Sequence, residues 1–139
     1  MTALLGVLVG AMIAALAQLW VRRSQTRERW LGELLKHCAA IYALESAFRG
    51  LAYDAVYGSG ESKARGWSAE QRRNAEAHVF LLAADPTLVS SVETLREAGR
   101  EMHRAIGTDA FEERALAHQN ELERFATAAR QALRRGRVV

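Results

Sequence analysis

The four histidines of the chain, His37, His78, His103 and His118, are the side chains best suited to acid–base or metal chemistry. A di-iron site in a helical bundle needs a Glu-x-x-His motif on two helices, and none of these histidines has a glutamate three residues before it. In an antiparallel bundle, His78 and His118 are expected at similar heights near Glu45, where the trio could bind a divalent ion or titrate near neutral pH. The alternative, and the commoner outcome, is a partly buried histidine with one hydrogen bond.

No other combination of residues indicates catalysis. The sequence contains no nucleophile elbow, phosphate-binding loop, glycine-rich dinucleotide turn or cysteine pair. Its single cysteine, Cys38, lies on an apolar helix face and is predicted to be a small buried side chain. Arg65, Arg72 and Arg73 belong to no recognisable nucleic-acid-binding module. We therefore predict a protein that is not an enzyme, needs no cofactor and binds no nucleic acid.

The most distinctive segment is the apolar run Thr2–Trp20, whose nineteen residues carry no formal charge and are followed at once by Val21, Arg22 and Arg23. At ~1.5 Å per residue it is ~28 Å long, close to the ~30 Å hydrocarbon thickness of a bilayer. Residues 1–21 are therefore predicted to form a transmembrane anchor. A cleaved signal peptide and the core helix of a soluble protein are the alternatives, and the positive charge that follows the run, rather than preceding it, favours an anchor.

The flanking residues also predict the orientation of the anchor. Four arginines follow it closely, Arg22, Arg23, Arg27 and Arg29. By the positive-inside rule they place the C-terminal domain in the cytoplasm and the N-terminus outside, in a single-pass protein of the inner (plasma) membrane.

One face of the anchor consists of small residues and a glutamine. Gly6, Gly10, Ala14 and Gln18 follow one another at four-residue steps, which stacks them on one side of a helix. Small side chains let two membrane helices approach closely, and a glutamine amide can bond across the pair. This face is predicted to pair membrane helices, although glycine and alanine are also common in single membrane helices.

Composition predicts an all-α protein. After the apolar run, alanine and arginine are abundant, β-branched residues are sparse, and one proline interrupts the chain. We expect one cytoplasmic domain, residues 22–135, an antiparallel up-and-down bundle of about four helices that the membrane helix enters without a break. The predicted helices cover residues 22–57, 69–84, 86–106 and 109–135, followed by a basic tail, residues 136–139.

Short sequence signals set these boundaries. Ser68 and Gln71 form an S-x-x-Q capping box at the start of the second helix. Asp85 and Pro86 end that helix and begin the next. A polar loop is expected over Gly58–Gly66. Glycines are expected to end the other three helices, at Gly58, Gly107 and Gly136.

The helix lengths predict an apolar strip that the bundle leaves uncovered. Residues 22–57 form a helix of ~54 Å and the second helix measures only ~22 Å, so helices two and three should cover only the membrane-distal half of helix one. Because such a strip is seldom left in water, we expect it to be covered by a second copy in a homodimer or higher oligomer, by a different protein, or by the chain's own tail. The strip consists of Trp30, Leu31, Leu34 and Leu35.

Basic residues at both ends of the bundle suggest contact with membrane lipid. Anionic headgroups attract arginines at about 1 kcal/mol for each basic residue near the surface. The alternatives are an ordinary positive-inside border and cations that stabilise a helix C-terminus. The predicted headgroup-binding residues are Arg22, Arg23, Arg134, Arg135 and Arg137.

These expectations together predict a single-pass, membrane-anchored helical adaptor that recruits or organises a protein partner at the cytoplasmic membrane surface. A holin-like protein that permeabilises the membrane is an alternative, but such proteins need little folded soluble mass. A helical sensor domain with a small ligand or metal between its helices is a further alternative.

Overall fold

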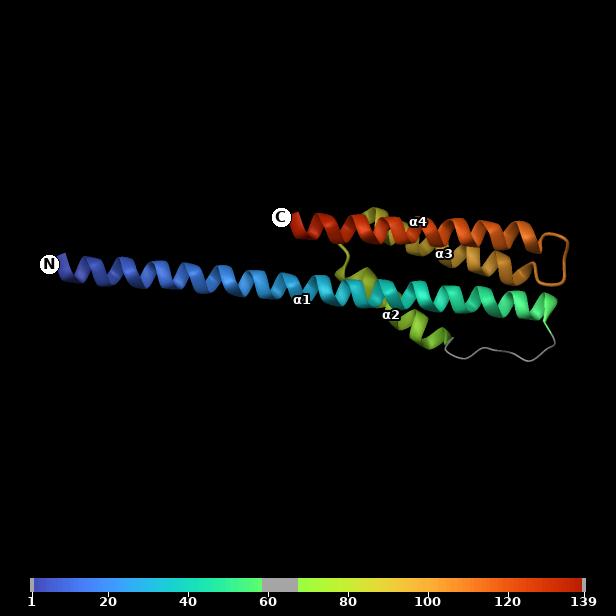
Figure 1. The fold of residues 1–139 in the computed structure, drawn as a ribbon, viewed down its shortest axis with the longest axis horizontal. Coiled ribbons are helices and arrows are strands. Elements are labelled where there is room, and N and C mark those ends of the chain that lie inside the picture. Colours follow the sequence, from blue (N-terminus) through green and yellow to red (C-terminus); the bar gives the residue numbers. More distant parts are fainter. Residues whose placement is uncertain (1, 59–67, 139) are drawn as a thin grey trace. The chain divides into compact units, whose positions relative to one another are not determined.

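The computed structural model describes residues 2–58 and 68–138 and shows an all-α protein, with four helices and no strand in these ranges. In chain order the helices are α1 Thr2–Tyr57, α2 Ala69–Leu82, α3 Pro86–Arg104 and α4 Phe111–Val138 (Figure 1). The chain divides into two units, Met1–Gly32 and Glu33–Val139. The all-α class predicted from composition is confirmed.

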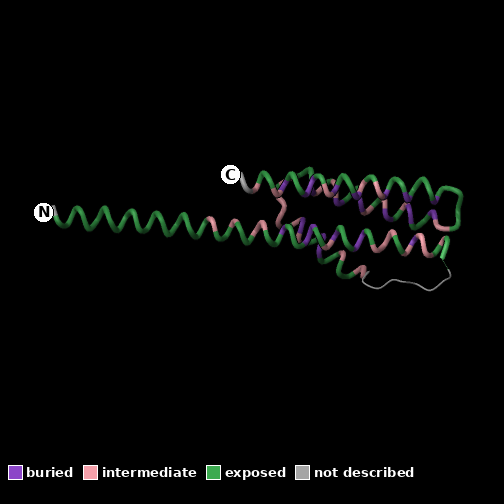
Figure 2. The backbone as a smooth tube through the Cα atoms, viewed as in Figure 1, coloured by how far each residue is buried: buried purple, intermediate pink, exposed green. Residues whose placement is uncertain are grey.

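The first unit is a single helical segment, the N-terminal part of α1, and every side chain from Ala3 to Arg23 is exposed (Figure 2). Helix α1 contains a window of 18 residues that is long and apolar enough to cross a membrane, and 0% of that window is buried. The core helix of a soluble protein also meets the length and composition criteria, but it buries its apolar side chains. The exposed leucines of this segment, such as Leu8 at 60%, therefore disfavour a soluble core helix.

The second unit is an antiparallel bundle of four helices. Helix α4 runs back along α1, since Tyr57 donates a hydrogen bond to Glu112 near the end of α1 and Arg49 donates to Gln119 further back. Figure 1 shows α3 beside α4, connected by a tight corner. The up-and-down order predicted from the short connections is the one observed.

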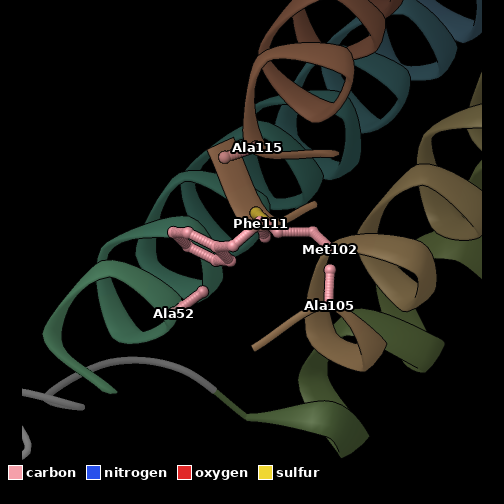
Figure 3. Packing of buried hydrophobic residues seen from close by; sticks show 5 residues of the cluster. All are labelled: Ala52, Met102, Ala105, Phe111 and Ala115. Atoms are coloured by element: carbon pink, nitrogen blue, oxygen red, sulfur yellow. The ribbon is translucent and has the colours of Figure 1, made fainter. Parts of the chain in front are cut away.

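A small apolar cluster holds the corner between α3 and α4 against α1 (Figure 3). Phe111, the first residue of α4, is 2% exposed, and its ring packs edge-on against Tyr53 of α1 with 5.3 Å between the ring centroids. Burying a large aromatic side chain stabilises the fold by ~1.5–3 kcal/mol. The buried members of the cluster are Ala52, Met102, Ala105, Phe111 and Ala115.

Two helix starts and the turn after α3 show the local features that the sequence indicated, although α2 and α3 end two residues earlier than predicted, at Leu82 and Arg104. The Ser68 hydroxyl accepts a hydrogen bond from the Gln71 amide at 3.3 Å. The Asp85 carboxylate accepts one from the Thr87 amide at 2.9 Å, and Pro86 is the first residue of α3. Gly107 has a φ of 81°, the left-handed conformation that glycine adopts without strain after a helix.

The fourth helix differs from the prediction at both ends. It begins at Phe111, two residues later than expected, and continues through Gly136 to Val138. A glycine ends a helix by adopting a left-handed conformation, and among the described glycines Gly107 alone has a positive φ. Gly136 instead stays helical, at an ordinary cost of ~1 kcal/mol relative to alanine. The predicted loop Gly58–Gly66 lies outside the described residues except for Gly58, and Val139 lies outside them as well.

Helix α2 lies further back along α1 than the predicted register. Arg72 of α2 is 3.4 Å from Glu45, and His78 stacks on His37 with 4.0 Å between the ring centroids. Glu45 precedes Tyr57 by twelve residues, or ~18 Å of helix. His37 lies in the membrane-proximal half of residues 22–57, so the prediction that α2 covers only the membrane-distal half is wrong.

This register corrects the apolar strip. Leu34 is fully buried at 0% exposure, Trp30 and Leu31 are half-buried, and Leu35 is 50% exposed. The chain itself therefore covers Leu34, whereas Leu35 is left open to water.

The buried thiol of Cys38 gives a first testable consequence of this packing. The side chain is 4% exposed, and burial raises the pKa of the thiol to about 11. Because the thiolate is the reactive form, we expect a maleimide to label the folded chain very slowly at pH 7 and rapidly in denaturant. The Ala77→Cys variant, at an exposed position of α2, should be labelled at once. Equal labelling rates for the two thiols in the folded protein would contradict the packing.

Candidate functional site: a buried charged cluster

Five charged or titratable side chains meet inside the bundle, and we call them the buried charged cluster. Two of them are completely buried: Glu45 and His118 are each 0% exposed. An ionised side chain is costly to bury unless it is paired and hydrogen-bonded, so each member needs a partner. The cluster draws on all four helices and consists of Glu45 of α1, Arg72 and Glu76 of α2, Arg96 of α3 and His118 of α4.

The pair formed by Glu45 and His118 is the centre of the cluster. The Nε2 atom of His118 lies 2.9 Å from Oε2 of Glu45. Since a carboxylate only accepts hydrogen bonds, the imidazole donates through Nε2–H. Its other nitrogen, Nδ1, is buried without a hydrogen-bond partner among the described residues. The pair therefore fixes the orientation of the imidazole ring, with Nε2–H directed at the carboxylate.

Arginines from α2 and α3 balance the two carboxylates. Arg72 lies 3.4 Å from Oε1 of Glu45 and 3.8 Å from Oε1 of Glu76. Arg96 lies 3.7 Å from Oε2 of Glu76. Negative and positive side chains thus alternate from Glu45 of α1 through α2 to Arg96 of α3. His118 of α4 contacts the Glu45 end of this row.

A glycine and an aromatic ring frame the central pair. A Cβ built on Gly99 of α3 would lie 3.4 Å from Oε2 of Glu45 and 3.8 Å from Cδ2 of His118. The ring of Phe48 lies edge-on to His118 with 6.5 Å between centroids, and the Arg72 guanidinium lies 5.9 Å above the same ring. The absence of a side chain at Gly99 therefore lets α3 approach the buried pair closely.

The pKa of the Glu76 carboxyl group is raised in the folded chain. Its side chain is 4% exposed, and this burial raises the pKa of the carboxyl group, while Arg96 and Arg72 lower it and Glu45 raises it further. A raised pKa in the folded state means that folding favours the protonated acid. The contribution of Glu76 to stability is therefore fully present below its ordinary pKa and is lost as pH rises through its folded-state pKa.

This sign predicts the pH dependence of a Glu76→Gln variant. Glutamine imitates the protonated acid, so the free energy of unfolding of the variant should rise relative to that of the unchanged protein as pH rises above the ordinary glutamate pKa of ~4.3. Chemical denaturation of the full chain in detergent micelles, followed by far-UV circular dichroism at several pH values, measures it. Glu93→Gln removes a carboxylate from an exposed position of α3 and controls for the loss of charge alone. A constant difference between Glu76→Gln and the unchanged protein at all pH values would contradict the assignment.

The structure brings together two members of the predicted histidine trio and separates the third. His118 and Glu45 are in contact, whereas His78 stacks on His37 and its Nδ1 lies 2.7 Å from the Asn74 carbonyl oxygen. No group of three histidine, cysteine, aspartate or glutamate side chains among the described residues is placed to hold a metal ion. The predicted metal trio is therefore not assembled in the part of the chain that the structure describes.

The remaining predicted site residues lie on exposed surface or in local contacts. The small face of α1 is exposed, and a Cβ added at Gly6 or Gly10 would meet nothing within 4 Å. Arg135 reaches Asp85 at the start of α3, 3.0 Å away, so it is held in an ion pair. The side chain of Arg137 lies outside the described residues. Other exposed members of these two predicted sets are Ala14, Gln18, Arg22, Arg23 and Arg134.

Three members of the cluster were not predicted from the sequence to be buried or paired, namely Arg72, Glu76 and Arg96. One signal for Glu76 was available, because it directly follows Ala75 and lies three residues before Val79, the two apolar residues that α2 buries. A charged residue at a position where the apolar repeat continues indicates a buried ion pair. Its partner on another helix could not be identified without the register of α2.

The carboxylates and the imidazole of the buried charged cluster are closed off from the grooves of the bundle by their burial. The cluster holds no cysteine, serine or threonine nucleophile, and a groove of about 930 Å³ between α3 and α4 is lined by other residues, mainly hydroxyl and amide side chains such as Ser90, Thr94 and Asn120. Comparison of the chain with protein-family models, with curated proteins and with solved structures found no match.

Proposed function

We propose that this chain is a single-pass membrane protein whose helical bundle recruits or organises a protein partner at the cytoplasmic face of the inner membrane. The observation that carries the proposal is the exposed apolar part of α1, which is long enough to cross a bilayer and is 0% buried. Burying such residues in lipid removes a large apolar surface from water. The arginines after it, beginning with Arg22 and Arg23, favour a cytoplasmic bundle.

The bundle supports a binding role because it is folded and has its own core. A membrane-permeabilising protein acts through its spans and needs little folded soluble mass, whereas residues of all four helices here pack around buried side chains such as Ile41, Val79, Leu95 and Phe125. A surface of fixed shape is what recognition of a partner requires. We therefore favour an adaptor over a holin-like protein.

Cell fractionation of the full chain with a C-terminal tag tests the anchor. We expect the protein in the membrane pellet after an alkaline carbonate wash, and a truncated chain beginning at Arg22 in the supernatant. Protease added to intact spheroplasts should leave the tag untouched, because the bundle faces the cytoplasm. A washed-out full chain, a tag digested in intact spheroplasts, or an intact mass that lacks the first residues would each overturn the proposed topology.

A photo-crosslinking residue at Tyr42 of α1 tests the recruitment step. Tyr42 is 42% exposed, whereas the predicted strip residue Leu34 is buried and unsuited to capture. We expect from this position one discrete adduct whose mass differs from that of two linked copies of the chain, and none from Ala77 on α2, which is also exposed. Adducts of the same kind from both positions would indicate unspecific contact and contradict a defined binding surface.

A further inference from the structure

Helix α1 presents a face to water that carries fewer charges than the exposed face of α4. From Leu35 to Ser46 its exposed positions carry one charge, Lys36. Along α4, five of the eight exposed positions between Glu112 and Arg124 are charged. A solvated helix face normally looks like that of α4, so the face of α1 is suited to contact with another surface.

The spacing of small residues on this face is that of a helix pair. Ala39, Ala43, Ser46 and Gly50 are exposed and follow one another at intervals of four, three and four residues. This alternation repeats every seven residues, as in the a and d positions along which two helices pack in a coiled coil. A Cβ added at Gly50 would meet nothing within 4 Å, so the approach to the backbone there is open. Small side chains alone do not identify a partner. The charged residues beside them, Arg49 and Asp54, do identify one.

The two charged residues that flank this row have no ion-pair partner among the described residues. Within the same ranges, Arg49 donates hydrogen bonds only to neutral groups, the Gln119 amide and the Tyr53 hydroxyl, and its Nε is buried without a partner. Neither Arg49 nor Asp54 belongs to any of the ion pairs between described residues. Both residues border one groove of about 420 Å³, together with Ser46 and Gly50.

The five-residue spacing of Arg49 and Asp54 indicates that the partner is a second copy of the chain. If Gly50 occupies an a position, Arg49 is at g and Asp54 is at e, five residues later. In a parallel two-stranded coiled coil, a g residue of one helix pairs with the e residue of the following heptad on the other helix, and such pairs choose the partner and its orientation. Arg49 therefore matches Asp54 of a second copy, twice in a symmetric pair. The two residues are too far apart along one helix to pair with each other, since only residues three or four apart are neighbours.

We infer that the exposed face of α1 formed by Ala39, Ala43, Ser46 and Gly50 is the interface of a parallel homodimer, closed by ion pairs between Arg49 of each copy and Asp54 of the other. The parallel orientation rests on the proposed function, because two copies anchored by the same N-terminal span enter the membrane in the same direction. The exposed side chains of Leu35 and Tyr42 occupy g positions of the same heptad pattern, beside the N-terminal half of the row. The dimer surface is thus the face opposite to Leu34, and not the strip predicted from sequence.

Charge reversal at the two flanking positions tests the inference on the full chain in detergent micelles. Arg49→Glu places two carboxylates together and Asp54→Arg places two guanidinium groups together, so each change alone should raise the dimer dissociation constant ~10-fold or more. The double variant Arg49→Glu/Asp54→Arg restores opposite charges and should return to within about threefold of the unchanged protein. Single-molecule mass measurement over a dilution series gives the dimer fraction. Loss of dimer in a single variant without rescue in the double variant would overturn the inference, as would a monomeric unchanged protein.

Two further variants separate this interface from others. In a Cys38→Ala background, Ser46→Cys should give an oxidised dimer, and Ala77→Cys, on the exposed face of α2, should not. Ala43→Glu should weaken the dimer strongly, whereas Ala77→Glu should leave it unchanged. A dimer that persists in all charge variants and is not crosslinked through position 46 would be held elsewhere, for example by the span, and would contradict the inference. Because dimerisation is measured in detergent, its failure is distinguishable from failure of the proposed topology, which fractionation of cells reports.

Discussion

Replacing Glu45 with alanine is expected to destabilise the bundle by about 3–5 kcal/mol, the range measured when one partner of a buried ion pair is removed. The carboxylate lies at the centre of the cluster, 2.9 Å from His118 Nε2 and 3.4 Å from Arg72 Nη1. Its removal leaves the imidazole N–H without this acceptor, and Arg72 loses the shorter of its two contacts with carboxylates, keeping the one to Glu76 at 3.8 Å. Denaturant titration of the full chain in detergent micelles, followed by far-UV circular dichroism, measures the loss.

Two further variants test whether the loss of stability comes from removing the buried charge of Glu45. Glu45→Gln keeps an oxygen acceptor near His118 but removes the charge, so its stability should lie between those of the alanine variant and the unchanged protein. Glu97→Ala removes a carboxylate from an exposed ion pair of α3, in which both side chains are 56% exposed, and should cost less than ~1 kcal/mol. Equal losses for Glu45→Ala and Glu97→Ala would contradict the central place of the buried pair.

The buried charged cluster contributes specificity of assembly more than net stability. A buried ion pair gains little over well-packed apolar side chains, because desolvation offsets much of the attraction. An apolar core tolerates shifts of one helix along another, whereas Glu45 finds its partners only when α2 places Arg72, and α4 places His118, at the correct height. The cluster therefore explains how a short helix that buries only three residues keeps one register.

Local signals in the sequence were sufficient for the fold class, for the end of α1 and for the starts of α2 and α3, whereas the other ends of α2, α3 and α4 differ from the prediction by two or three residues. Ser68, Asp85 and Gly107 act within a few residues of themselves, and each makes the contact or adopts the conformation that its type predicts. Gly136 shows the limit of local signals, since a glycine permits a left-handed conformation without requiring it. Whether a helix stops at a glycine also depends on the residues after it.

The position of α2 along α1 could not be predicted in the same way. It depends on contacts between residues distant in sequence, such as Arg72 with Glu45 and His78 with His37. The antiparallel arrangement expected from short connections placed α2 over the membrane-distal half of residues 22–57. That register put His78 near Glu45 and left Leu34 uncovered. The pairing of His118 with Glu45 was predicted because α4 does follow the expected antiparallel register.

Leu34 and Leu35 are neighbours in sequence, and substituting each with alanine should have very different effects. Leu34 is 0% exposed, so Leu34→Ala should cost about 2–5 kcal/mol from lost burial and the cavity that remains. Leu35 is 50% exposed, so Leu35→Ala should change the free energy of unfolding by no more than ~0.5 kcal/mol. The two changes remove the same atoms from the same helix, and the pair therefore isolates the effect of burial.

The same denaturant titrations measure this difference, in micelles dilute enough that the chain is monomeric. The sequence placed both leucines in one partner-binding strip, and a strip that only a partner covers would give small, similar losses for both variants in the monomer. A large loss for Leu34→Ala alone instead assigns Leu34 to the core of the single chain. It then leaves Leu35 on the opposite side, with the row of small residues that we assign to the second copy.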